Sequence, residues 1–126
     1  MLTFNLKKEW FEKIKSGEKT TEYRKCGSYW DKRVLNLIIK AQCSEAKELA
    51  REWTQVSQRN YTNFSVPVNI LCCFKLGYPK TNDNKRILNA KVKRIFLENN
   101  KKTNLKSDLK TESPLYGFEF EVIKND

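Results

Sequence analysis

The sequence predicts an α+β fold, a small β-barrel of about five or six strands decorated by two helices. Several segments alternate apolar and polar residues as half-buried strands do, and two others have the spacing of amphipathic helices. The regular strand–helix alternation of a parallel sheet is missing, which favours a barrel over a doubly wound sheet. The length of 126 residues fits one domain. A hydrophobic fraction of 39% with 12% aromatic residues argues against disorder.

The N-terminal quarter predicts a strand, a helix and an extended segment. Residues 2–6 alternate, which indicates a strand. A helix is predicted over 7–16, and Gly17 can end it in the left-handed conformation that glycine adopts at low cost. The apolar stripe of this helix consists of Trp10, Phe11 and Ile14. Residues 20–24 are predicted to be extended.

The middle of the chain predicts a loop, a buried strand and a second helix. Residues 26–33 are predicted to form the loop, and the apolar run within 33–40 predicts a strand buried on both faces. Ser44 can cap a helix that ends before Asn60. The apolar face of that helix consists of Ala46, Leu49, Ala50, Trp53 and Val56.

Three strands are predicted in the C-terminal half. The first covers 66–78 and leaves through a turn at Gly77, and the second covers 87–97. The third covers 116–122 and is half exposed, because its apolar and polar residues alternate strictly. The polar segments between them are predicted to be loops.

The charge balance suggests a polyanionic partner. The chain has 25 Lys and Arg against 15 Asp and Glu, a net charge of +10, and most of the excess lies in residues 75–110. A compositional bias toward Lys and Asn, as in an A/T-rich genome, would also explain it. The chain contains no histidine, so any catalysis depends on other residue types, such as Lys and Glu.

The cysteines predict neither a metal site nor a disulfide framework. The four thiols include no CxxC pair, and adjacent strand residues point to opposite faces. The four are Cys26, Cys43, Cys72 and Cys73. No signal peptide and no membrane span are predicted, so we expect a cytoplasmic protein with reduced thiols. No metal and no cofactor is predicted, and the oligomeric state stays open.

The segment Gly17-Glu-Lys-Thr-Thr-Glu-Tyr-Arg24 is the most informative part of the sequence. On an ideal strand, Thr20, Glu22 and Arg24 share one face, and Lys19 and Tyr23 lie on the other. Two interpretations are open. Glu22 and Arg24 could form an ion pair that closes one end of the barrel. Alternatively, Lys19 and Arg24 could offer an ammonium and a planar guanidinium to a phosphate or a carbonyl.

This segment resembles the ASCH domain, a relative of the PUA-like RNA-binding barrels. The matching residues are Trp10, Ile14, Gly17, Lys19, Thr20, Glu22 and Arg24. Residues 74–78, 90–95 and 116–120 fit the family more loosely. The resemblance implies a single ASCH-like domain over 1–126 with a PUA-like barrel, and a variable helical insertion at about 42–65.

The resemblance also implies a cleft beside Gly17–Arg24 that accepts RNA or a modified nucleoside. Some ASCH proteins look like ribonucleases, and here Lys19 and Glu22 would be the catalytic cation and base, with or without a metal. Strict alternation would separate these two side chains, and a Glu22 locked to Arg24 would be a poor base. A related group resembles amidohydrolases of acetylated cytidine. In that group a Thr occupies the position of Glu22, which weakens this alternative.

Two adjacent aromatic residues follow the motif, in the loop predicted at 26–33. An exposed Tyr29 or Trp30 could stack on an unpaired base while Lys32 and Arg33 contact phosphates, or Trp30 could simply plug the barrel. The residues predicted to bind RNA or a nucleotide are Thr20, Tyr23, Arg24, Tyr29, Trp30, Lys32, Arg33, Lys91 and Lys93. We therefore expect an RNA-binding or nucleotide-binding protein. A ribonuclease and a protein-interaction domain are the alternatives.

Overall fold

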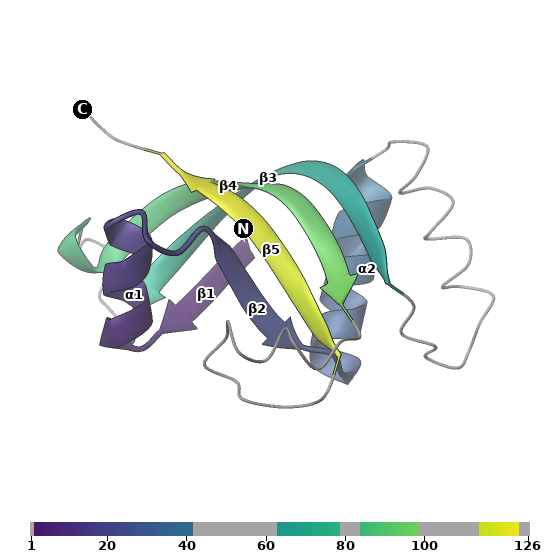
Figure 1. The fold of residues 1–126 in the computed structure, drawn as a ribbon, viewed down its shortest axis with the longest axis horizontal. Coiled ribbons are helices and arrows are strands. Elements are labelled where there is room, and N and C mark those ends of the chain that lie inside the picture. The colour runs from purple at the N-terminus through teal and green to yellow at the C-terminus, as the bar shows by residue number, and fades with distance from the viewer. Residues whose placement is uncertain (1, 42–62, 79–83, 99–113, 124–126) are drawn as a thin grey trace.

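A five-stranded mixed sheet curls into a half-barrel, with one helix at each end (Figure 1). The computed structural model describes residues 2–41, 63–78, 84–98 and 114–123. Its elements are β1 (Leu2–Leu6), α1 (Lys8–Lys15), β2 (Thr21–Lys25), α2 (Ser28–Ala41), β3 (Phe64–Leu76), the 3₁₀ turn η1 (Asn84–Arg86), β4 (Ile87–Glu98) and β5 (Leu115–Val122). The predicted α+β class with a curled, barrel-like sheet is confirmed for this part of the chain. Of the two described helices, only α1 lies where a helix was predicted.

The strand order is β1-β3-β4-β5-β2, so β1 and β2 are the two edges of the sheet. β1 pairs with β3 in parallel, and the other three pairs are antiparallel. Register shifts interrupt β3 between Pro67 and Ile70 and β4 between Val92 and Arg94. Such irregularities bend a strand and increase its twist, which fits the curl of this sheet.

One hydrophobic core joins the sheet to both helices. The sheet contributes stacked and tilted rings, among them Phe4, Phe74 and Phe118, which are fully buried. α1 adds Phe11 and Ile14, as its predicted apolar stripe requires. Burying a large apolar side chain stabilises a fold by about 1.5–3 kcal/mol, so these residues dominate its stability.

The predicted strand at 33–40 is wrong, and the predicted loop at 26–33 is wrong from Ser28 onward, because these residues form α2. Val34 and Ile38, four residues apart, are fully buried, whereas Ile39 is 50% exposed. This is the periodicity of a helix, since a strand buried on both faces would also cover Ile39. The other strands and the helix α1 lie within a few residues of their predicted bounds.

Several predictions fall outside the described residues. The helix predicted from Ser44 lies there, as do the polar loops apart from η1. Of the insertion predicted at about 42–65, residues 64 and 65 belong to β3. The predicted turn at Gly77 is confirmed by a φ of +65°.

Candidate nucleic-acid interface

The Gly17–Arg24 segment leaves α1 through a tight turn before it becomes β2. Gly17 has a φ of +86°, and the Lys19 N–H donates to the Lys13 carbonyl at 3.0 Å. Lys19 therefore precedes the strand, which begins at Thr21, and strand alternation does not govern its direction. The expectation that Lys19 and Glu22 lie on opposite faces is wrong for this reason.

Lys19, Glu22 and Arg24 form one ion cluster. The Lys19 Nζ lies 2.7 Å from the Glu22 Oε1, and the Arg24 Nη2 lies 2.8 Å from the Glu22 Oε2. The side chains of Lys19, Glu22 and Arg24 are 9%, 4% and 24% exposed, respectively. Each carboxylate oxygen thus accepts a charge-assisted bond, and the cluster keeps one net positive charge.

Aromatic rings lie at both ends of this cluster. The Lys19 Nζ lies 4.6 Å from the centroid of the Trp10 ring, on α1. The Arg24 Cζ lies 5.1 Å from the ring centroid of Phe4 and 5.8 Å from that of Trp30, on α2. Cations held over rings in this way are stabilised by the negative face of the ring. The cluster therefore links the two helices along β2, one edge of the sheet.

The first turns of α2 carry an exposed aromatic residue and a stacked arginine. Tyr29 is 60% exposed, and the Arg33 Cζ lies 3.4 Å from the centroid of its ring. Arg33 also donates to the Tyr29 carbonyl at 3.2 Å. Trp30 stacks on Phe4 at 5.5 Å with an interplanar angle of 13° and is half-buried. Trp30 packs against the core, as one of the two interpretations proposes, but it also remains partly accessible.

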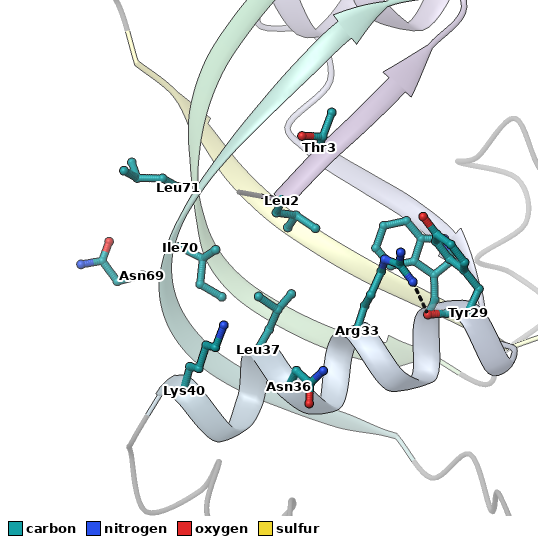
Figure 2. Close-up of a pocket in the computed structure, with 11 residues that line it drawn as sticks. Leu2, Thr3, Tyr29, Arg33, Asn36, Leu37, Lys40, Asn69, Ile70 and Leu71 are labelled. Carbon is teal, nitrogen blue, oxygen red and sulfur yellow. Dashed lines mark hydrogen bonds between the residues drawn. The ribbon is translucent and has the colours of Figure 1, made fainter.

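An open pocket of about 710 Å³ lies between α2, the start of β1 and the middle of β3 (Figure 2). Trp30 belongs to its wall, together with Tyr29 and Arg33. Its lining residues are Leu2, Thr3, Tyr29, Trp30, Arg33, Asn36, Leu37, Lys40, Asn69, Ile70 and Leu71. The sequence prediction missed Asn36 and Lys40, because it placed them on a strand. Their spacing from Arg33 would have revealed them on a helix.

The remaining predicted ligand residues lie elsewhere. Thr20 is exposed just before β2, and Lys32 is exposed on α2. Tyr23 packs against Phe96, with ring centroids 6.1 Å apart, and burial together with Glu98 and Glu119 raises the pKa of Tyr23. The structure does not place these residues, or Lys91 and Lys93 on β4, in the wall of the pocket.

Burial favours the neutral form of two of the described thiols, those of Cys26 and Cys72. Burial raises the pKa of Cys26 and that of Cys72 to about 12, and the charge of Asp31 adds to the effect at Cys26. Cys26, Cys72 and Cys73 are free. Within the described ranges, no group of three potential metal ligands occurs. Neither described helix is long and apolar enough to cross a membrane.

No protein-family model matches this chain, and no curated protein or solved structure is significantly similar to it. The functional argument therefore depends on the geometry of the ion cluster and of the pocket. The resemblance to the ASCH domain stays an expectation based on the Gly17–Arg24 segment.

Proposed function

We propose that this protein is a PUA-like domain of the ASCH type that binds single-stranded RNA where the Gly17–Arg24 segment meets α2. The observation that carries the proposal is the position of Trp30. Its ring contacts Arg24 of the ion cluster and also lines the pocket beside Tyr29 and Arg33. Trp30 therefore connects the Gly17–Arg24 segment with the aromatic residues that follow it in the sequence.

The chemistry of this surface suits an unpaired nucleotide. Stacking on an aromatic ring is available to every base, and arginine offers a planar cation to phosphate or to a base face. Tyr29 and Arg33 supply both within one helical turn.

The ion cluster favours binding over cleavage. A ribonuclease needs a base that can reach the 2′-hydroxyl of its substrate. Glu22 is 4% exposed, and its two oxygens already accept bonds from Lys19 and Arg24. Glu22 therefore has the properties of a residue that positions two cations.

The test is fluorescence anisotropy with a labelled single-stranded RNA of mixed sequence, at several salt concentrations. We expect binding that weakens steeply with salt, because phosphate contacts release counterions. Tyr29→Ala should weaken binding about tenfold, since a stacked base contributes about 1–3 kcal/mol. Tyr29→Phe keeps the ring and serves as the matched control.

The same samples are then analysed on a denaturing gel. We expect the RNA to be recovered intact, with and without a divalent metal. Shortened products that disappear in Lys19→Ala would favour the ribonuclease alternative. No retention of RNA even at low salt would overturn the proposal and favour the interaction-domain alternative.

A further inference from the structure

One face of α2 provides most of the polar wall of the pocket, and its two cations are well separated. Figure 2 shows Arg33 and Tyr29 toward one end of the helix and Lys40 toward the other, with Leu37 between them. Arg33 and Lys40 are seven residues apart, which corresponds to about 10 Å along a helix. Both side chains are exposed. The pocket is thus bounded by a positive charge at each end.

The centre of the pocket is apolar. Leu2 of β1 and Ile70 of β3 face Leu37 across it (Figure 2). None of the described residues that line the pocket is acidic. Its volume lies in the range of about 300–1,000 Å³ that is typical of small-molecule sites. A ligand with two separated negative charges and a flat apolar group beside them fits this arrangement.

The irregularity of β3 supports a binding role for this wall. The register with β4 shifts between Pro67 and Ile70, and the β3 residues that line the pocket, Asn69 to Leu71, lie within this shift or directly after it. Bulges are common beside binding sites, because they change the direction of neighbouring side chains. Leu71, the second residue after the shift, is 54% exposed at the border of the pocket.

We infer that this pocket holds one internal nucleotide of a single-stranded RNA, with its two flanking phosphates on Arg33 and Lys40. The base then lies on the apolar surface of Leu2, Leu37 and Ile70. The class of ligand rests on the proposed function. The position of the binding site and the requirement for two phosphates follow from the residues of the pocket itself.

The test uses amide NMR titrations of the full chain with three probes: uridine 3′,5′-bisphosphate, uridine 5′-monophosphate and uridine. We expect the bisphosphate to bind most tightly and uridine most weakly, with the shifts concentrated in α2. Arg33→Ala and Lys40→Ala should each weaken bisphosphate binding about tenfold, as expected for one lost charge-assisted phosphate contact. They should weaken uridine binding much less.

Lys8→Ala is the matched control. Lys8 is exposed on α1, at the opposite end of the sheet from α2 (Figure 1), so its removal lowers the net charge equally without touching the pocket. Equal effects of Lys8→Ala, Arg33→Ala and Lys40→Ala would overturn the inference, as would equal affinities for the three probes. In either case, binding of RNA by the wild-type protein would still support the proposed function. Bisphosphate binding that depends on Lys40, without any binding of RNA, would instead contradict the proposed function. It would still support the pocket as a binding site for two phosphates.

Discussion

Among the charged residues that the structure describes, only Glu22 is buried. Desolvating such a carboxylate is costly, and the attraction of two cations at 2.7 and 2.8 Å offsets that cost. The same two bonds fix Lys19 beside Trp10 and Arg24 beside Trp30. At the residue scale, one side chain therefore determines where both cations of the motif lie.

Glu22→Gln should lower the free energy of unfolding by about 2–4 kcal/mol, because it leaves two neighbouring cations without a counter-charge. Urea unfolding of the purified protein measures this loss. Glu18→Gln is the control, since Glu18 is an exposed acid in the same segment and its replacement should change stability by less than about 0.5 kcal/mol. Similar losses for both variants would show that the cluster contributes no more than an exposed charge.

The sequence identified the members of this cluster but not all of its contacts. A carboxylate and an arginine two positions apart on a strand predict a pair, and the Glu22–Arg24 bond confirms it. The Lys19 contact could not be predicted by alternation, because the turn at Gly17 sets the direction of Lys19. The contact of Arg24 with Trp30 depends on where α2 packs, and local spacing contains no information about that.

The helix α2 is held to the sheet through its first turn. The Asp31 Oδ1 accepts hydrogen bonds from the Gly27 N–H at 3.2 Å and from the Tyr116 hydroxyl at 2.6 Å. The first bond caps the helix, and the second ties it to β5. Tyr29, Trp30 and Arg33 lie in these same turns, so the tie also positions the candidate interface.

Tyr116→Phe should lower the free energy of unfolding by about 1–2 kcal/mol, because it removes a partly buried hydrogen bond to a carboxylate. It should also speed amide hydrogen exchange in the first turn of α2. Both effects are measured against Tyr29→Phe, which removes a hydroxyl from an exposed ring on the same helix. Unchanged exchange in the Tyr116 variant would contradict the anchoring role.

α2 is also where the sequence prediction failed. An apolar run such as Val34-Leu-Asn-Leu-Ile-Ile39 is compatible with a buried strand or with a helix, and β-branched residues favour the strand. The tertiary contacts of Val34 and Ile38 override that preference. The strands with strict alternation were predicted correctly, because apolar residues at every second position do not fit the periodicity of a helix.

The buried thiols make the stability of the whole molecule fall at alkaline pH. Cys26 and Cys72 have pKa values raised from 9.0 to about 12 in the folded protein. Between these values the unfolded chain loses thiol protons that the folded protein keeps, so the thiols contribute less and less stability. Below about pH 9 their contribution is fully present.

The free energy of unfolding should therefore fall as pH rises from about 9 to about 10.5. Urea unfolding at several pH values measures the slope. A variant with Cys26→Ala and Cys72→Ala should show a shallower fall, whatever its stability at neutral pH. Identical slopes in the variant and the wild type would assign the alkaline sensitivity to other groups.

The pairing of the two edge strands has a consequence for how the chain folds. Thr3 of β1 lies beside Cys73 of β3, 70 positions away, and Thr21 of β2 pairs with Glu119 near the other end of the chain. Contacts so distant in sequence carry a large loop-closure cost and slow the search for the native state. During synthesis on the ribosome, β1 cannot pair before β3 has emerged, and β2 cannot pair before β5 has emerged. β1, with its buried residues Phe4 and Leu6, therefore stays unpaired until β3 is available, and the sheet assembles late and as a unit.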